Sequence, residues 1–379
     1  MMKKILFPML AAVLFSGCVS TEEKKAQELN NRRLIYALEY PGTARLKLTL
    51  DRGGDPNFKD KYGVPALVKA VALNKMEHVK MLLDRGADVN AADPDGETAV
   101  FAAVSNNNRK LLDLLISKGA SVKVRGRNGK TPAMEAARLG HFDMLKYLLE
   151  KGCDINAVDD NTAGLAAYAA TAPVKAIEQL KYLEKNGIKA DVQNTELMGS
   201  PFLRALFFDR VKTALYLLPK MQNLNADRRM KEIGRLAVYY AIAHNRIDLL
   251  KALIDKKVEL NYNEPFYYKF VKKIDVKGVY KLAARNDVID KRYTPLMYAC
   301  IFGRVDMIKL LIYSGANPMI ENNEGQKAMA YAKDSATSAT IKKLTKEWYT
   351  ARLENKKKTS GLVIEKDTSI KRASIFDIQ

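Results

Sequence analysis

The sequence predicts an all-α solenoid of about eight to nine helix–turn–helix units, and three observations carry this prediction. The first is a constant period of 33 residues, which appears when the segments starting at residues 32, 65, 98 and 131 are aligned without a gap. The second is a glycine that returns in step with the period, at Gly53, Gly86, Gly119 and Gly152. The third is an alanine five residues into each segment, which persists where the rest of the pattern becomes irregular.

Each segment has the apolar pattern of two short helices. A first helix is followed by a polar break, and a second helix then carries a leucine pair such as Leu82–Leu83. The glycine after the second helix predicts a left-handed helix end. Threonine before the first helix, followed by proline, predicts a capped start. A polar connection such as "DVNAADPDGE" leads to the next unit, and we expect it to form a short β-hairpin finger.

The recurring alanine marks a position where neighbouring helices pack too closely for a larger side chain. It returns at every unit, with one much longer step before the eighth unit. The array is therefore expected to cover residues 32–349, with units starting near 32, 65, 98, 131, 164, 200, 236, 294 and 327. The nine alanines are Ala37, Ala70, Ala103, Ala136, Ala169, Ala205, Ala241, Ala299 and Ala332.

Two copies of the unit resemble the ankyrin repeat. They are "TPAMEAARLGHFDMLKYLLEKGCDIN" from Thr131 and "TPLMYACIFGRVDMIKLLIYSGANP" from Thr294. Both are similar to the family's T-P-L-H-x-A opening, G-H-x-x-x-V middle and L-L-x-x-G-A-D close. The resemblance implies a scaffold that binds proteins, and a fold alone indicates no chemistry. The last unit, from Lys327, contains Trp348 and is expected to be a C-terminal cap.

The N-terminus predicts an exported, lipid-anchored protein. Residues 1–17 combine "MMKK" with the eleven-residue apolar run "ILFPMLAAVLF", which is shorter than the ~20 residues that span a bilayer. "FSGC" resembles the lipobox of bacterial lipoproteins, and this implies cleavage before Cys18 and lipid on its sulfur. Val19 follows where inner-membrane lipoproteins carry aspartate, so the resemblance favours the outer membrane and its periplasmic face. An ordinary secretory peptide is the alternative.

Residues 18–31 are expected to tether the array to this anchor. The stretch from Val19 to Asn31 would reach at most ~45 Å. At the other end, residues 350–379 carry a net charge of +3 and predict a basic flexible tail. A membrane-surface contact through Lys356–Lys358 is the alternative for this tail.

Composition argues against a metal or catalytic centre. The chain has 379 residues, three histidines, three cysteines and a formal charge of +20, which favours an acidic partner. Cys153 and Cys300 fall in different units, ~30–40 Å apart by helix-layer spacing, so they are expected to be free. Structural roles are expected for the histidines, His78, His141 and His244, because no two share metal-ligand spacing.

One insertion interrupts the array at about residues 262–292. Asn90 lies 8 residues before Thr98, whereas the equivalent residue Asn261 lies 33 residues before Thr294, so about 25 extra residues separate the two units. Two interpretations stay open. The aromatic residues form a small local core, or they form a binding hot spot together with the neighbouring lysines. The residues concerned are Phe266, Tyr267, Tyr268, Lys269, Phe270, Lys272 and Lys273.

The function predicted from the sequence is a lipid-anchored periplasmic scaffold that recognises a protein through its concave and finger surface. We expect a monomer, an acidic protein partner and membrane attachment through the N-terminal lipid. We expect no catalytic residues, cofactor, metal, nucleic acid or small-molecule substrate. Two alternatives remain: an immunity or inhibitor protein that neutralises an envelope-acting toxin or lipase, and an envelope-structural or assembly factor.

Overall fold

The structure is a computed structural model that describes residues 21–189, 199–262 and 292–360. It forms two compact halves, residues 1–205 and 206–379. Every named element in the described residues is helical. The predicted all-α architecture is therefore confirmed.

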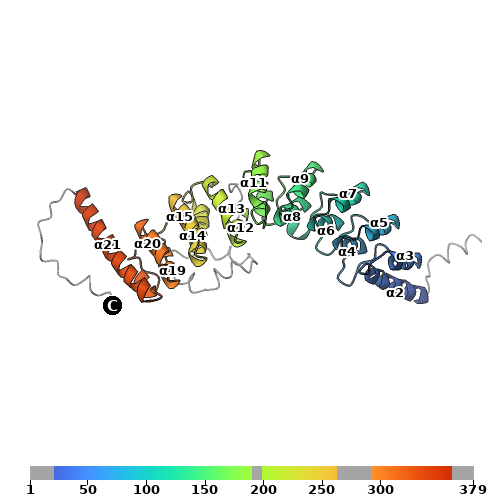
Figure 1. Ribbon diagram of the computed structural model, residues 1–379, viewed down its shortest axis with the longest axis horizontal. Coiled ribbons are helices and arrows are strands. Elements are labelled where there is room, and N and C mark those ends of the chain that lie inside the picture. The colour runs from blue at the N-terminus through green and yellow to red at the C-terminus, as the bar shows by residue number, and fades with distance from the viewer. Residues whose placement is uncertain (1–20, 190–198, 263–291, 361–379) are drawn as a thin grey trace, which may run out of the picture. The chain divides into compact units, whose positions relative to one another are not determined.

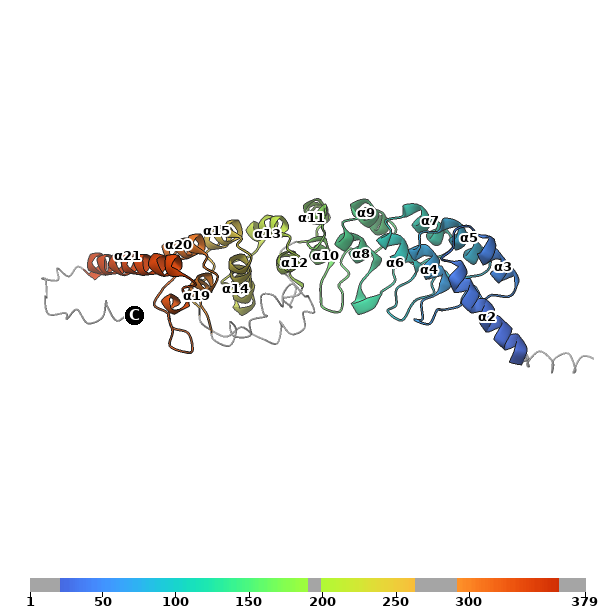
Figure 2. The same cartoon turned by 60° about the horizontal axis from the view of Figure 1, so that its bottom comes forward.

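In the first half, short helices alternate between two rows. The first helices α4, α6, α8 and α10 stack on one another, and each packs against the second helix that follows it (Figures 1 and 2). The helices are α2 (Thr21–Ala37), α3 (Ala44–Asp51), α4 (Ala66–Ala72), α5 (Met76–Asp84), α6 (Ala99–Ser105), α7 (Arg109–Ser117), α8 (Pro132–Leu139), α9 (Phe142–Glu150), α10 (Leu165–Ala169) and α11 (Ala176–Lys185), with the short η1 (Arg127–Gly129) and, at the division, α12 (Pro201–Phe207).

The predicted helix-end signals are found in the structure. The glycine after the second helix has a φ of +85° at Gly86 and +91° at Gly119, a conformation that L side chains rarely adopt. Thr131 caps α8 by accepting the backbone N–H of Met134 at 3.3 Å, and Pro132 is the first helical residue. Thr98 opens α6 without a side-chain capping bond. Threonine therefore caps only some of the units.

The recurring alanine lies at the interface between stacked helices. Eight of the nine alanines are buried, the exception being Ala332. Ala332 is half-buried because the last unit replaces its first helix with a 3-10 turn, η4 (Ala328–Tyr331), which ends before the alanine. The expected close-packed position is therefore absent from the last unit.

The fingers are narrower than the predicted β-hairpins. Three of them close with one isolated antiparallel bridge each, at Lys59–Pro65, Ala92–Thr98 and Val158–Gly164. Each of these fingers is also closed from within by an aspartate. Asp93, for example, accepts the backbone N–H groups of Asp95 at 2.9 Å and Glu97 at 2.8 Å. A side-chain turn therefore supplies bonds that a longer strand ladder would otherwise make.

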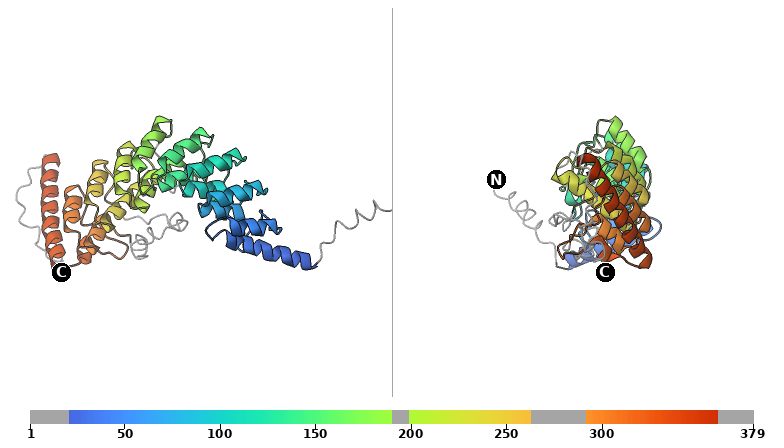
Figure 3. Two further views of the ribbon diagram at one scale, coloured as in Figure 1. Left: turned by 45° about the vertical axis from the view of Figure 1, so that its right-hand side comes forward. Right: turned by 90° about the vertical axis from the view of Figure 1, so that its left-hand side faces the viewer.

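The second half repeats the helix pairs with less regular lengths. Its helices are α13 (Val211–Leu217), η3 (Leu218–Lys220), α14 (Arg228–Ala243), α15 (Ile247–Asp255), α19 (Pro295–Ile301), α20 (Val305–Tyr313), η4 and α21 (Ser335–Ser360). α21 lies beside α20 (Figure 3). The sequence places the start of the seventh unit near residue 236, whereas α14 starts at Arg228. Asp227 caps this earlier start by accepting the N–H of Met230 at 2.8 Å.

Helices extend beyond the predicted array at both ends. α2 begins at Thr21, inside the segment 18–31 that the sequence assigns to a tether. α21 continues to Ser360, inside the predicted tail, and the first glycine after its start is Gly361. Neither helix contains glycine or proline, so nothing in the local sequence stops it.

Asparagine side chains join several, though not all, of the units to the next, and we call this series of bonds the asparagine ladder. Asn57 and Asn90 each donate to the carbonyl of the glycine 29 residues later. Asn90 also accepts the N–H of Ser121 at 2.9 Å. In the second half Asn261 makes the same pair of bonds, to Gly315 and Asn317, which lie 54 and 56 residues later. The residues that the sequence assigns to the insertion lie between Asn261 and these two partners.

Candidate functional site

A row of side chains crosses the first-helix surface of the first half. It is formed by the residue immediately before each recurring alanine, so its members repeat with the period of the units. They are Tyr36, Lys69, Ala102, Glu135 and Tyr168. Because every member takes the same place on its helix, the row follows the stack from one unit to the next. Lys69 is tied to the start of the array by an ion pair with Glu39, at 2.8 Å.

The buried carboxylate of Glu135 is the centre of an ion cluster in this row, and the other members of the cluster are partly exposed. Its carboxylate receives two bonds from Arg138, at 2.7 and 3.0 Å, and lies 3.0 Å from the ammonium of Lys130. Lys130 also lies 3.1 Å from Glu97. The four groups carry two positive and two negative charges, so the cluster is neutral as a whole.

The Glu135 cluster keeps its carboxylate ionised. Burial by itself raises the pKa of Glu135, but the hydrogen bond from Arg138 and the charges of Lys130 and Arg138 outweigh it. The net effect is a pKa below the ordinary value. Arg138, in turn, has a raised pKa, first because of its hydrogen bond to Glu135. The charged state of this cluster is therefore the stable one at neutral pH.

A second buried cluster joins the fourth finger to α10 and α12. Asp159 accepts the hydroxyl of Tyr168 at 2.7 Å and the backbone N–H of Ala163 at 2.8 Å. The guanidinium of Arg204 lies 3.6 Å from Asp159 and 4.6 Å from the centre of the Tyr168 ring. Burial, followed by the bond to Asp159, raises the pKa of Tyr168. Tyr168 therefore stays protonated and holds the finger to the helix row.

The four fingers of the first half alternate in charge. They are residues 58–65, 91–98, 124–131 and 157–164, and Figure 2 shows them extending from the first-helix row. The second and fourth are acidic, and the third is basic. Neighbouring fingers are joined: Arg125 donates to the carbonyl of Val158 at 2.9 Å, and Lys59 donates to that of Ala92 at 2.9 Å. Together the fingers carry five basic and six acidic residues, so the chain's charge excess lies elsewhere.

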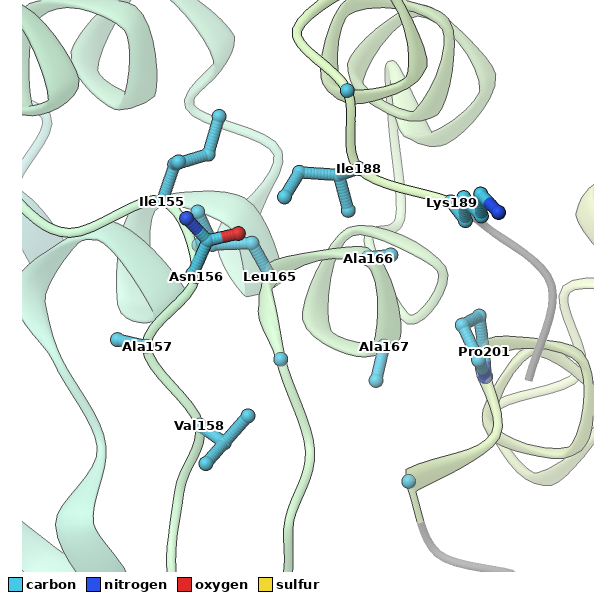
Figure 4. A pocket seen from close by; sticks show the side chains of 13 residues that line it. Ile155, Asn156, Ala157, Val158, Leu165, Ala166, Ala167, Ile188, Lys189 and Pro201 are labelled. Carbon is cyan, nitrogen blue, oxygen red and sulfur yellow. The ribbon is translucent and has the colours of Figure 1, made fainter. Parts of the chain in front are cut away.

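A pocket of about 290 Å³ opens where the asparagine ladder is interrupted. Asn156 lies two units after Asn90, at the equivalent position of its own unit. Its side chain, however, makes no hydrogen bond with any residue that the structure describes. Ile155, Asn156 and Ile188 surround the space, between the fourth finger and the chain that follows α11 (Figure 4). The pocket lies at the edge of the candidate surface, and polar and apolar atoms line it about equally.

The predicted aromatic site of the insertion lies outside the described residues. It comprises Phe266, Tyr267, Tyr268, Lys269, Phe270, Lys272 and Lys273, and Cys18 also lies outside. The flanks of the insertion, however, are described. Tyr239 donates its hydroxyl to the carbonyl of Tyr293, and its ring lies 5.9 Å from that of Tyr262 and 5.1 Å from that of Tyr298. A buried tyrosine cluster therefore holds both ends of the insertion.

The cysteines and histidines occupy structural positions. Cys153 and Cys300 are both free and buried. Burial raises the pKa of Cys153 to about 11 and also raises that of Cys300, opposite to what a nucleophilic thiol needs. His141 places Nε2 3.3 Å from the carbonyl of Ser105. No cluster of three potential metal ligands occurs in the parts of the chain that the structure describes.

Sequence reasoning missed both buried ion clusters and the tyrosine cluster. Some members are close in sequence, as Glu135 is to Lys130 and Arg138, but Glu97, Arg204 and Tyr293 reach their partners only because the chain stacks unit on unit. One signal could have found part of the row. The residue before the recurring alanine is a tyrosine in five of the nine units, namely Tyr36, Tyr168, Tyr240, Tyr298 and Tyr331.

Comparison with known families identifies the repeats. The family described as Ankyrin repeats (3 copies) matches residues 34–126 and 95–159, and the family described as Ankyrin repeat matches residues 291–323. Together with the stacked helix pairs, these matches define an all-α ankyrin-repeat solenoid. Ankyrin repeats generally act as protein–protein interaction scaffolds and are typically non-enzymatic. No curated protein matches the chain.

The helices lack membrane-spanning character. Within residues 21–189, 199–262 and 292–360, no helix has both the length and the apolar composition needed to cross a bilayer.

Proposed function

We propose that the protein is a lipid-anchored scaffold that binds a partner protein through the fingers of its first half and the part of the first-helix row from Lys69 to Tyr168. One observation carries this proposal: the surface is already held in place by its own bonds. The Glu135 and Asp159 clusters fix side chains that would otherwise have to be ordered on binding. A preformed surface loses little conformational entropy when a partner docks.

Two exposed apolar side chains on the fingers are the strongest candidates for contact residues. Tyr62 lies near the tip of the first finger and is 69% exposed, and Val158 lies on the fourth finger and is 41% exposed. Exposed tyrosine offers a large, rigid contact area, and it is enriched among the residues that dominate binding energy. The aromatic residues of the insertion, Phe266 to Phe270, are a second set of candidates.

The charge of the partner can be inferred from the kinetics of binding. The whole chain carries +20, which favours an acidic partner, but the charges of the four fingers nearly cancel. If an acidic protein docks on the fingers, the positive charge elsewhere accelerates its approach rather than strengthening the contact. Its association rate should then fall as salt is added, while its dissociation rate changes little.

The anchor and location form the second part of the proposal. Cys18 would carry the lipid at the outer membrane, with the array on the periplasmic side as a monomer. Supporting this are the basic start, the eleven-residue apolar run and the "FSGC" sequence. Labelling cells with radioactive palmitate tests it directly. Label is expected on the full chain and is expected to be lost in Cys18→Ser.

Capture of the partner from cell envelopes tests the binding surface. The intact protein would be crosslinked and pulled down beside the double variant Tyr62→Ala, Val158→Ala and beside a deletion of residues 264–291. Tyr313→Ala with Tyr349→Ala is the matched control, because these tyrosines are exposed on α20 and α21 of the second half. Loss in the first variant alone supports the proposed surface.

The other outcomes point elsewhere. Loss in the deletion alone would move the contact to the insertion. A captured hydrolase or toxin would favour the immunity interpretation. If no protein is captured and cells lacking the protein are misshapen or leaky, the envelope-structural alternative replaces the scaffold.

A further inference from the structure

The outward face of α2 exposes two large apolar side chains. Leu29 is 49% exposed and Tyr36 is 66% exposed, although α2 buries Leu34 and Ile35 on its other side. Counting along the helix from Lys25, the positions i, i+4, i+8 and i+11 are Lys25, Leu29, Arg33 and Tyr36, which share one side. α2 therefore has two apolar faces, and only one of them is used by the array.

Side-chain bonds fix the direction of this face. Gln27 donates to the carbonyl of Gly53 at 2.8 Å, and Asn30 donates to that of Arg52 at 2.8 Å. Asn31 accepts the backbone N–H of Asp55 at 2.8 Å. These three bonds hold the inner side of α2 to the chain after α3. Since α2 cannot roll freely, its outward face keeps one orientation relative to the first half.

The charges around the exposed apolar residues are mostly positive. α2 has four basic residues and three acids, a net +1, and two of the acids, Glu22 and Glu23, lie in its first turn. Glu28 pairs with Arg32 at 2.6 Å. Lys25 and Arg33 form no ion pair with any residue that the structure describes. Exposed leucine and tyrosine beside lysine and arginine can place apolar groups among lipid headgroups while the cationic ends meet phosphate.

The position of α2 in the chain brings it close to the proposed anchor. Only Val19 and Ser20 separate Cys18 from the first residue of the helix. Three consecutive Cα steps span at most ~11 Å, whereas a tether ending at residue 31 would have spanned ~45 Å. α2 itself is ~25 Å long, by its 17 residues. A lipid on Cys18 would therefore hold α2 at the bilayer surface.

We propose that the outward face of α2 lies on an anionic phospholipid surface. Leu29 and Tyr36 enter the headgroup region, and Lys25, Arg32 and Arg33 contact phosphate groups. This contact would fix the direction in which the array leaves the membrane. The proposal rests on the proposed anchor for the location of α2, but the binding of α2 to lipid can be measured without the anchor.

The test uses the chain from residue 18 onward with Cys18→Ser, so that no lipid is attached. Sedimentation with vesicles of phosphatidylglycerol and phosphatidylethanolamine measures its binding, and phosphatidylcholine vesicles serve as the uncharged comparison. Each basic residue at an anionic surface contributes a factor of about five, so the variant Lys25→Ser, Arg33→Ser should bind the anionic vesicles about 25-fold more weakly.

A second variant and a control distinguish vesicle binding through the outward face of α2 from binding caused by the overall charge of the chain. Leu29→Ser with Tyr36→Ser keeps every charge and should also weaken binding. Lys342→Ser with Lys346→Ser removes two exposed lysines of α21 and should bind like the parent chain. All of these side chains are exposed, so circular dichroism and the melting temperature should be unchanged.

Three results would overturn the proposal. The first is an absence of binding to anionic vesicles, and the second is an equal loss in the α21 control. The third is a dimer in solution that dissociates in the α2 variants, which would make the face a contact between two copies. Palmitate labelling is independent of all three, so failure of the anchor and failure of the α2 contact are distinguishable.

Discussion

Asn261 donates its side-chain amide to the carbonyl of Gly315 at 2.9 Å, across 54 residues of chain. The same side chain accepts the N–H of Asn317 at 2.7 Å. Because Asn57 and Asn90 make the equivalent bond across 29 residues, the insertion leaves the array and returns to it within one rung of the ladder. The seventh and eighth units therefore stack as if the insertion were absent.

Removing the two hydrogen bonds of the Asn261 side chain should destabilise the second half. Asn261→Ala removes both bonds, and because they are exposed and water can replace the lost partner, we expect a loss of about 0.5–1.5 kcal/mol in the free energy of unfolding. Urea denaturation measures it, and hydrogen exchange localises it to α15 and α20. Asn156→Ala is the matched control, since the Asn156 side chain bonds to no described residue, and it should change stability by less than about 0.5 kcal/mol. Equal effects would contradict this account of the ladder.

Enlarging a recurring alanine should also be costly. Ala70 is fully buried in α4, and Ala70→Leu is expected to destabilise the protein by about 1–3 kcal/mol through overpacking. Ala72 is exposed in the same helix, so Ala72→Leu should have little effect on the urea midpoint. If Ala70→Leu is tolerated equally well, the helices do not require a small residue at this position.

Removing the buried carboxylate of Glu135 should lower the free energy of unfolding more than removing an exposed carboxylate. Glu135→Gln leaves Lys130 and Arg138 without their shared partner, and breaking a buried pair in this way costs about 3 kcal/mol. Glu77 forms an ion pair with Lys80 on the surface, at 2.9 Å, and Glu77→Gln should cost at most about 1 kcal/mol. Thermal unfolding of the two variants at neutral pH compares them. A similar shift in both would show that burial does not strengthen the cluster.

His78 should make stability depend on pH below neutrality. Burial, followed by the charge of Lys75, lowers the pKa of His78 below its ordinary value of 6.5. The unfolded chain then binds the proton more readily than the folded one, so the stability is fully present above pH 6.5 and is lost as the pH falls through the folded pKa. Urea midpoints between pH 8 and pH 5 measure the slope. The urea midpoint should depend less on pH in His78→Gln than in the parent protein, and in His141→Gln the dependence should be unchanged.

The buried thiols should be inert until the protein unfolds. Cys153 and Cys300 are buried and their pKa values are raised, so a thiol reagent such as Ellman's reagent should react with neither in the native protein at pH 8. Both should react rapidly in urea. The experiment uses the variant Cys18→Ser, so that only Cys153 and Cys300 can react with the reagent. Rapid native reaction of one thiol would show that its region opens locally.

Much of the fold could be predicted because its signals are local. A glycine at a helix end, a threonine before a helix and an alanine between helices each act on their immediate neighbours, and the period repeats them. Such signals indicated the helix pairs and the place of the insertion. They did not indicate the helix ends at Thr21 and Ser360, because the ends of the array are defined by what the terminal helices pack against and not by a repeat.

The candidate site was predictable only in part, because its chemistry depends on neighbours in space. From the sequence alone, a scaffold of ankyrin type with a positive charge and an aromatic insertion could be inferred. That Lys130 also meets Glu97 of the preceding finger, and that Arg204 reaches Asp159, is decided by stacking. The period determined the repeated helix pairs, since they are formed by residues close in sequence. Tertiary structure determined the surface, since its partners come from different units.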